Sequence, residues 1–514
     1  MMYKQAPSKH LSTTPAPSSL SPPMGRRGSV LASVACLALL SACAVGPDFE
    51  KPKAPEITGY TPEPLAAETA STETKGGDAQ RFVSDMDIPG QWWTLFHSEP
   101  LNSLIDQSLK ANPDLKGAQA ALRGAMENLH AEQAAFFPTI QAGFSPQRYK
   151  NAAQISPTLS TPATYFNLYT AQLSVSYPLD IWGGTRRSVE SARAQAEAQR
   201  YQLETTYLTL TSNVVAAAIQ EASLKAQIAA TEDIVKVETE SLVLMRKQLT
   251  LGQAAGGDVA AQEAALAQAQ TSLPPLQKQL AQQRDLIAAL SGRFPSDQPT
   301  ESFDLTALEL PTALPVSLPA TLIEHRPDIR AAAEDLHSST AQIGVAISNM
   351  LPNLTLSATD GSSATQLGQL FQAGNGFWVL GGNLTQTIFD GGALLAKKRQ
   401  ADAALDQSMA QYESTVISAF QNVADALRAL QSDADAVKAG VAAEHAAQRS
   451  LDIARRQQQL GAISYLAMLN AEQTYQQAVI GLVQAKAGRY ADTAALFQAL
   501  GGGWWNREDV VAQE

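Results

Sequence analysis

Two long stretches of the chain carry apolar residues at alternating spacings of four and three, the pattern of a coiled-coil seam. The second stretch contains Val416, Phe420, Val423, Leu427, Leu430, Ala434, Val437 and Val441. The first contains Leu203, Tyr207, Leu210, Val214 and Ala217, with Leu224 and Ile228 later in phase. This pattern predicts two very long helices, at about 187–251 and 394–460. At ~1.5 Å per residue, each would be about 100 Å long.

Shorter helices are predicted around each long one. A first helix begins near Pro100 or Pro319 and stops before the next proline, because a residue before proline disfavours the helical region. A second begins at that proline and covers 113–137 or 327–351. A return helix covers 258–291 or 464–499. The second and return helices together would span about 90 Å, so end to end they match one long helix.

Two segments alternate between apolar and polar residues over about ten positions. In the first, one face contains Tyr169, Ala171, Leu173, Val175, Tyr177 and Leu179, and the other contains Thr170, Gln172, Ser174 and Ser176. In the second, Trp378, Leu380, Leu384 and Ile388 oppose Asn383, Thr385 and Thr387. Such runs suit strands of a transmembrane barrel, although a half-buried soluble sheet shows the same pattern. We predict one strand hairpin before each long helix.

The whole set of elements occurs twice. Asn112-Pro113-Asp114-Leu115 returns 214 residues later as Arg326-Pro327-Asp328-Ile329, and Phe137-Pro138 returns as Leu351-Pro352. Further on the offset is 209, where Arg246 returns as Arg455, Gly252 as Gly461 and Glu263 as Glu472. The first copy should therefore contain a loop five residues longer between Pro138 and Asn213, because insertions concentrate in exposed turns. We divide the chain into a leader (1–42), an extended segment (43–90), repeats at 91–311 and 312–500, and a tail (501–514).

The leader has the features of a secretory signal. Arg26 and Arg27 precede an apolar run from Val30 to Leu40, which is too short to span a bilayer. Leu40-Ser41-Ala42-Cys43 resembles a bacterial lipobox, so we expect a diacylglycerol and an N-acyl chain on Cys43 and no other cofactor. Residue 44 is Ala rather than an inner-membrane retention Asp, which favours the outer membrane. Met24 is an alternative start.

Charge excludes one class of partner. The net charge of −12 becomes −16 once the four cations of residues 1–42 are removed. An acidic body argues against nucleic acid as a partner and is compatible with a periplasmic surface or a water-filled lumen. We find no phosphate loop, no Gly-x-Ser-x-Gly and no histidine pair at metal-ligand spacing, and predict that the chain is not an enzyme.

Four strands per chain cannot close a barrel in lipid, where an open edge leaves backbone groups unpaired. Three chains would supply twelve strands and twelve helical columns around a lumen. The predicted fold is mostly α with a small membrane β part. Each protomer is a duplicated unit of helical hairpin plus β-hairpin, and a homotrimer forms a twelve-stranded β-barrel and a long periplasmic α-helical barrel.

At this point the motifs match a known family. The chain from Cys43 to about Trp505 resembles the outer membrane factors of tripartite efflux systems, in their NodT-like lipoprotein branch. The motifs that carry the resemblance are Cys43-Ala44-Val45-Gly46-Pro47-Asp48-Phe49, Trp92-Trp93, Asp180-Ile181-Trp182-Gly183-Gly184, His325-Arg326-Pro327-Asp328-Ile329-Arg330, Leu351-Pro352-Asn353-Leu354, Phe389-Asp390-Gly391-Gly392 and Gly461-Ala462-Ile463-Ser464-Tyr465-Leu466. The resemblance implies a lipid-anchored homotrimer in the outer membrane. It also implies a periplasmic adaptor and an inner-membrane pump, usually of the resistance-nodulation-division type, as partners.

The resemblance also points to a mouth at the helical tips. In relatives this end is narrowed by rings of side chains, often acidic. Carried over by motif, those positions are Leu466, Ala467 and Asn470 in the second copy and Asp258 in the first. Ala467 and Asn470 depart from the acidic pattern, which argues against a tight carboxylate ring and leaves a hydrophobic ring of Leu466.

Basic residues follow both strand-to-helix corners, at Arg186 and Arg187 and at Lys397, Lys398 and Arg399. A solvated helix start is one reading, although cations there oppose the helix dipole. Because both copies carry basic residues at this place, we expect contact with headgroups of outer-membrane lipid instead. The main functional prediction is a passive efflux channel. An exit for polypeptides or oligosaccharides, and a lipid-tethered coiled-coil scaffold without a pore, remain as alternatives.

Overall fold

The computed structural model describes residues 44–57, 59–84, 86–150 and 165–508. The described residues from Val45 onward form one compact unit, to which all the elements below belong. Cys43 and the rest of the predicted leader lie outside the described residues. The helices are α2 (Glu99–Ala111), α3 (Pro113–Gln133), α4 (Gly184–Thr250), α5 (Gly256–Leu290), α6 (Pro319–His325), α7 (Pro327–Ser348), α8 (Ala393–Gln459) and α9 (Tyr465–Ala499). Short 3-10 helices are η1 (Trp92–Phe96), η2 (Ala134–Phe136), η3 (Leu367–Gln369) and η4 (Trp504–Asn506).

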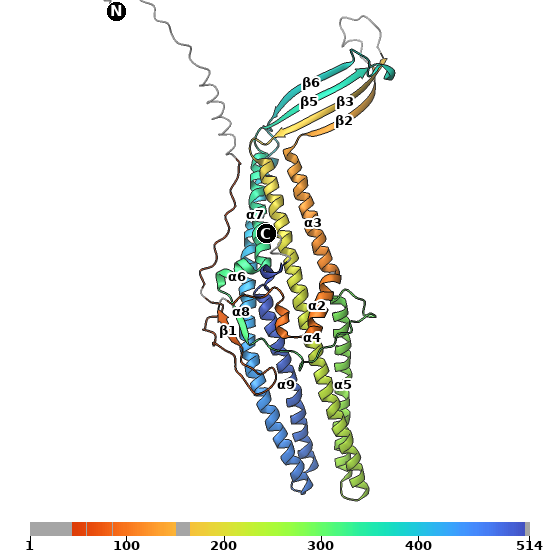
Figure 1. Ribbon diagram of the computed structural model, residues 1–514, viewed down its shortest axis with the longest axis vertical. Helices are drawn as coiled ribbons and strands as arrows, with labels where there is room; N and C mark the ends of the chain where they lie inside the picture. The colour runs from red at the N-terminus through yellow and green to blue at the C-terminus, as the bar shows by residue number, and fades with distance from the viewer. Residues whose placement is uncertain (1–43, 58, 85, 151–164, 509–514) are drawn as a thin grey trace, which may run out of the picture. The chain divides into compact units, whose positions relative to one another are not determined.

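The duplication is visible in the lengths of the helices. The long helices α4 and α8 each have 67 residues, and the return helices α5 and α9 each have 35. Helix α4 packs against α3 and α5, and α5 continues along it below α3 (Figure 1). Helix α8 packs in the same way against α7 and α9. The prediction that two shorter helices pair with one long helix is confirmed.

The apolar seam of the long helices is buried as its spacing indicates. On α8, Val423, Leu427, Leu430 and Val437 are fully inaccessible to solvent. On α4, Val214 and Ala217 join the same core cluster, which also contains the aromatic side chains of Trp92, Trp93 and Phe497. Helices α4 and α9 are in contact, so this core joins the two copies. Burial of these apolar side chains against neighbouring helices is the main source of stability for the long helices.

Both long helices begin at the same kind of corner. The carboxylate of Asp180 accepts hydrogen bonds from the backbone N–H groups of Thr185 (3.0 Å) and Arg186 (3.1 Å). The carboxylate of Asp390 accepts three, from Gly392, Ala393 and Leu394, at 2.7–3.1 Å. A carboxylate here satisfies free N–H groups and complements the helix dipole. The glycine pairs are thus strand-to-helix corners, with Gly183 and Gly392 at φ 78° and 91°.

The strands are β1 (Arg81–Ser84), β2 (Thr139–Lys150), β3 (Tyr165–Leu179), β4 (Ala313–Val316), β5 (Asn353–Ala364) and β6 (Gly376–Thr385). Four of them form one antiparallel sheet in the order β2-β3-β5-β6, in which Leu173 lies opposite Ala142 and Asp360. Within the residues that the structure describes, strands β2 and β6 have no partner on their outer sides. Strands β2 and β5 begin 214 residues apart, whereas α4 and α8 begin 209 apart. The longer connection in the first copy therefore lies between these points, as predicted.

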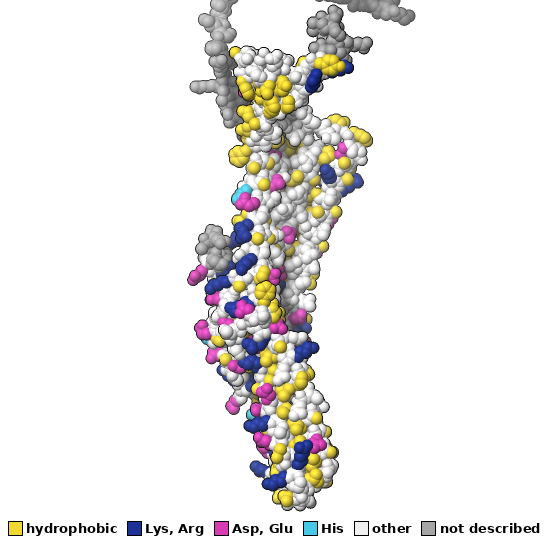
Figure 2. Space-filling model, turned by 90° about the vertical axis from the view of Figure 1, so that its right-hand side faces the viewer, with side chains coloured by type: hydrophobic (Ala, Val, Ile, Leu, Met, Phe, Trp, Pro, Cys, Tyr) yellow, Lys and Arg dark blue, Asp and Glu magenta, His cyan; other side chains and the backbone are white. Residues whose placement is uncertain are grey.

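The sheet exposes many large apolar side chains. Large exposed hydrophobic side chains on it are Ile140, Phe144, Leu173, Trp378, Leu380 and Leu384. In Figure 2 hydrophobic side chains gather at the sheet, and acidic and basic side chains are distributed over the helices. Among the helices that the structure describes, none has both the length and the apolar run needed to cross a membrane.

Three local expectations were wrong. Helices α3 and α7 end at Gln133 and Ser348 rather than at 137 and 351, because the chain tightens into η2 or a turn before the proline. Strand β6 ends at Thr385, so Ile388 is not part of it. The segment before Trp92 is not merely extended, since β1 pairs in parallel with β4.

The segment before Trp92 is held by a buried cation. Arg489 of α9 is inaccessible to solvent and donates to the carbonyl oxygens of Gly76 (2.9 Å) and Asp78 (2.6 Å). It also donates to the side-chain oxygens of Thr69 (3.0 Å) and Gln80 (3.2 Å). Charge-assisted hydrogen bonds of this kind are about twice as strong as neutral ones. They fix residues 69–80 on the helices.

Candidate functional site

The predicted mouth lies where α4 turns into α5 and α8 turns into α9. Leu466 is 58% exposed in the first turn of α9, and Asn470 is exposed one turn later on the same face. The hydroxyl of Ser464 accepts the backbone N–H of Ala467 (3.2 Å) and so caps α9. Both side chains are free of the core of their own chain, as ring-forming residues would have to be. That they form a constriction stays a prediction.

Asp258 has a structural role at the matching tip. Its carboxylate accepts the backbone N–H of Ala255 (3.4 Å) at the start of α5, and its side chain is half-buried. The negative charge therefore stabilises the helix N-terminus. Asp258 and Leu466 occupy the first turns of α5 and α9, and their neighbours Val259 and Tyr465 belong to one buried apolar cluster. The structure thus brings the two copies of the predicted mouth together in one chain.

Just above the tips, each copy has an ion pair at the same place. Arg246 on α4 pairs with Glu263 on α5 (2.7 Å), and Arg455 on α8 pairs with Glu472 on α9 (2.8 Å). The first pair is exposed, whereas Glu472 is buried. Burial raises the pKa of the Glu472 carboxyl, the nearby charge of Glu238 raises it further, and Arg455 opposes both.

A buried polar network that the sequence did not indicate joins α4, α5 and α9. Glu238 of α4 is 1% exposed. It accepts a hydrogen bond from the side-chain amide of Gln262 and another, of 2.9 Å, from the side-chain amide of Gln476. The hydroxyl of Tyr465 contacts the amide oxygen of Gln262, and burial raises its pKa. No spacing rule reveals such a network, because its members come from three helices. What the sequence did contain was glutamate and glutamine at positions of the helical seams that are otherwise apolar.

The predicted basic sites differ from one another. Arg187 is 4% exposed, and its guanidinium bonds to Asp48 (2.6 Å), Glu190 (2.7 Å) and the carbonyl of Val45 (3.3 Å). This placement departs from the headgroup contact we expected, because residues 45–48 cover the cation. Arg186 is partly exposed and pairs with Asp180 (3.2 Å).

The second group of basic residues is open to solvent. Lys397 and Arg399 are exposed, and Lys398 is partly buried and pairs with Asp402 (2.8 Å). These three lie in the second turn of α8, which begins at Ala393 after the sheet ends at Thr385. Their position is compatible with headgroup contact, which stays a prediction.

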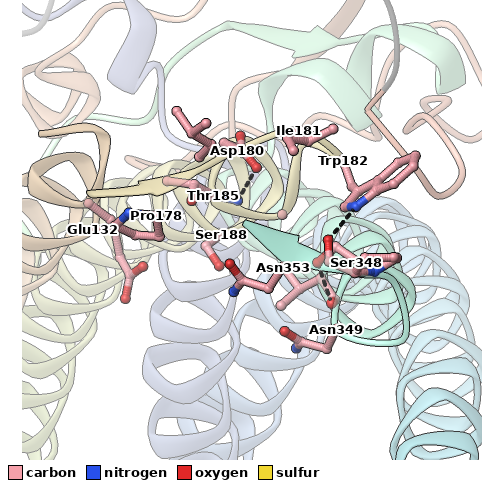
Figure 3. Close-up of a pocket in the computed structure, with 15 residues that line it drawn as sticks. Glu132, Pro178, Asp180, Ile181, Trp182, Thr185, Ser188, Ser348, Asn349 and Asn353 are labelled. Atoms are coloured by element: carbon pink, nitrogen blue, oxygen red, sulfur yellow. Dashed lines mark hydrogen bonds between the residues drawn. The ribbon is translucent and has the colours of Figure 1, made fainter. Parts of the chain in front are cut away.

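A pocket of about 220 Å³ lies where the sheet meets the helices. Figure 3 shows Glu132, Asp180, Ser188, Asn349 and Asn353 around it. The indole N–H of Trp182 donates to the carbonyl of Pro352 (2.8 Å), and the carbonyl of Trp182 accepts the N–H of Val45 (2.9 Å). Trp182 thus joins β5 and the start of the described chain to the corner before α4. In the described part of the chain no group of three or more His, Cys, Asp or Glu residues could hold a metal ion.

The chain is similar in sequence to outer-membrane efflux proteins. The profile of the family described as "Outer membrane efflux protein" matches residues 104–293 and 318–502. The toluene efflux pump outer membrane protein TtgF of Pseudomonas putida is 30% identical over 483 residues, which cover 92% of this chain and 97% of that protein. The pyoverdine export outer membrane protein OpmQ of Pseudomonas aeruginosa is 28% identical over 464 residues, covering 89% and 96%.

The fold agrees with this likeness. The outer-membrane channel OprN matches with a TM-score of 0.80 and 28% identity over 90% of this chain and 100% of that one. The family match spans both copies of the duplicated unit, and the resemblance seen in the motifs is confirmed. The chain belongs to the outer membrane efflux protein family and acts in the outer membrane.

Proposed function

We propose that three copies of the chain form a passive duct that carries small molecules from a periplasmic adaptor and an inner-membrane pump across the outer membrane. The pump would be of the resistance-nodulation-division type and would supply the energy. The observation that carries the proposal is the four-stranded sheet with two free edges and an apolar surface, joined to helical hairpins of 67 and 35 residues. A sheet with open edges in lipid needs further strands, because unpaired backbone groups there cost several kcal/mol each.

The length of the helices supports the periplasmic part of the proposal. Each long helix spans about 100 Å at ~1.5 Å per residue, so a ring of them would make a long channel away from the membrane. Relatives carry different cargo by name, toluene for TtgF and pyoverdine for OpmQ. We infer that the pump selects the substrate and that this chain admits a range of small organic molecules.

Reconstitution in a planar lipid bilayer tests the duct. The purified protein should give discrete single-channel current steps. A variant lacking residues 139–179 and 353–385 would remove both hairpins and should give none. Absence of steps from the intact, folded protein would favour the pore-free scaffold instead.

Cross-linking in the native host separates small-molecule efflux from polypeptide or oligosaccharide export. A proton-driven pump captured with the adaptor would support the proposal. An exporter dedicated to polypeptides, captured in its place, would contradict it.

A further inference from the structure

A second cavity lies in the helical wall, well away from the sheet. It is a half-open cleft with a volume of about 430 Å³, lined by α4 on one side and by α8 and α9 on the other. Ile234 and Val237 of α4 and Val479 of α9 form its apolar wall. The volume lies within the range of pockets that hold small organic ligands, roughly 300–1,000 Å³. We refer to it as the α4–α9 pocket.

The polar lining of the α4–α9 pocket has an excess of negative charge. Asp233 is exposed at its edge, and the buried Glu472 forms part of its lining together with its partner Arg455. Gln476 also lines the pocket, and its side-chain amide donates to the buried Glu238 behind it (2.9 Å). The lining therefore holds two carboxylates, Asp233 and Glu472, against one guanidinium, and the carboxylate of Glu238 lies behind Gln476. The buried Glu472 is poorly solvated, and a carboxylate in such a place attracts a cation more strongly than it would in water.

Comparison of the two copies shows which features of the pocket are not needed by the scaffold. The arginine–glutamate pair occurs in both copies, as Arg455–Glu472 and Arg246–Glu263. The α4 residues of the pocket are Ala230, Asp233, Ile234 and Val237, and the residues 209 positions later are Ala439, Ala442, Ala443 and Ala446. The α9 residues Tyr475, Gln476 and Val479 correspond to Leu266, Ala267 and Gln270. Alanine at these positions is sufficient to form the long helix of the second copy. Asp233, Ile234 and Val237 are therefore not required by the helix itself and are features of the pocket.

We infer that the α4–α9 pocket binds a small amphipathic organic cation, with the charged group near Glu472 and Asp233 and the apolar body against Ile234, Val237 and Val479. Tyr475 adds an aromatic ring, whose face attracts cations. Apolar contact and charge attraction then act on the same molecule. The site belongs to one chain and goes beyond the proposed function, because a duct can conduct whether or not its wall binds a ligand.

Fluorescence anisotropy with ethidium, a planar apolar cation, tests the inference on the purified full-length protein in mild detergent. We expect saturable binding with one site per chain. Glu472→Gln should weaken binding about tenfold, because it removes one buried charge and leaves Arg455 uncompensated. Asp233→Asn should weaken it severalfold, and Val479→Trp should abolish it by filling the cavity.

The duplication supplies a matched control. Glu263→Gln removes the equivalent carboxylate in the first copy, where no ethidium should bind, and should leave the dissociation constant unchanged. Tetraphenylphosphonium should displace ethidium, whereas fluorescein, an anion of similar size, should not. If Glu472→Gln does not fold, Asp233→Asn and Val479→Trp still decide the matter, because Asp233 is exposed and Val479 only partly buried.

Two results would overturn the inference. Absence of saturable binding would mean that the pocket is closed to small molecules in the assembled protein, for example by another copy. Equal affinity in the wild type, Asp233→Asn and Val479→Trp would place ethidium elsewhere. Neither result would bear on single-channel conductance, so the binding site and the proposed duct are tested independently.

Discussion

Buried charged side chains in this protein hold separate segments together. Arg489 holds residues 69–80, Arg187 holds Asp48, and Arg507 pairs with Glu204 (2.6 Å). Each guanidinium is itself largely buried and bonds to carboxylate or carbonyl oxygens of a segment distant in the chain. Removal of one member of such a set is costly, because the remaining groups keep their desolvation penalty.

The first residue-level prediction concerns a carboxyl pair between α8 and α9. Burial and, after it, the neighbouring Asp492 together raise the pKa of Asp433 to about 7, against the opposing charge of Arg489. The folded protein therefore holds a proton that the unfolded chain releases near pH 4. Stability from this pair is present at low pH and decreases as the pH rises to about 7.

Asp433→Asn should remove that dependence, because an amide can donate to Asp492 at any pH. Between pH 5 and pH 8 the melting temperature of the wild type should fall by several degrees more than that of the variant. Asp435→Asn, an exposed aspartate on the same helix, is the control and should behave like the wild type. Parallel pH curves for all three proteins would show that the pair does not titrate.

The second residue-level prediction concerns Cys43, which the structure does not describe. Leu40-Ser41-Ala42-Cys43 predicts acylation of this cysteine. A tritiated fatty acid should label the wild type in growing cells and should not label Cys43→Ser. Equal labelling of both proteins would disprove the lipobox assignment. The variant should still assemble in part, since the sheet also holds the protein in the membrane.

Residues 69–80 are distant from α9 in the sequence but are bound to it by Arg489, and a substitution of Arg489 tests this contact. Arg489→Leu would leave four oxygen acceptors of residues 69–80 without their donor. We expect a loss of roughly 3 kcal/mol in the binding of this segment. Limited proteolysis should then cut within residues 69–80 much faster than in the wild type. The control Arg428→Leu, on the other helix of the hairpin, should leave the cleavage rate unchanged.

The helical elements were predictable because each rests on a local signal. The apolar seam placed α4 and α8 within three residues of their observed ends, and the prolines placed the starts of α3 and α7. The pairing of β1 with β4 joins residues more than 200 positions apart, so no local pattern could indicate it. Arg187 looked exposed in the sequence, because the segment that covers it lies 139 residues earlier.

The predicted mouth depends on assembly as well as on the sequence of one chain. Leu466 and Asn470 could be placed on one exposed helix face from spacing and motif alone. Their effect depends on three-fold packing, which a single chain does not contain. We expect Leu466→Ser to raise single-channel conductance, because a hydrophobic ring opposes ion passage by dewetting. It should also make cells more permeable to large antibiotics such as vancomycin.

Asn470→Asp gives a complementary test at the same tip. An asparagine ring binds divalent cations poorly, whereas a ring of three carboxylates binds them through oxygen. The variant should lose current when millimolar divalent ions are added on the periplasmic side, and the wild type should not. If neither tip variant alters conductance or block, the two residues do not line the constriction.

At the scale of the whole molecule, the free edges of the sheet govern assembly. In the described part of the chain β2 pairs only with β3, and β6 pairs only with β5, so the sheet has two long open edges beside exposed apolar side chains. Three chains joined edge to edge would form one closed sheet of twelve strands. We therefore expect native mass spectrometry in mild detergent to give three times the mass of one mature chain.

A variant aimed at one edge tests this reasoning. On an edge strand, alternate residues direct their N–H groups outward, so Val379→Pro with Leu380→Pro must remove an outward donor whichever residue holds it. The double variant should be monomeric or aggregated. Its helical circular dichroism should remain near that of the wild type, because the helices form their core without the sheet. A wild-type protein that is monomeric in mild detergent with its strands intact would contradict the closure argument. In that case the long helices could not surround a lumen, and the scaffold alternative would become the better account of the fold.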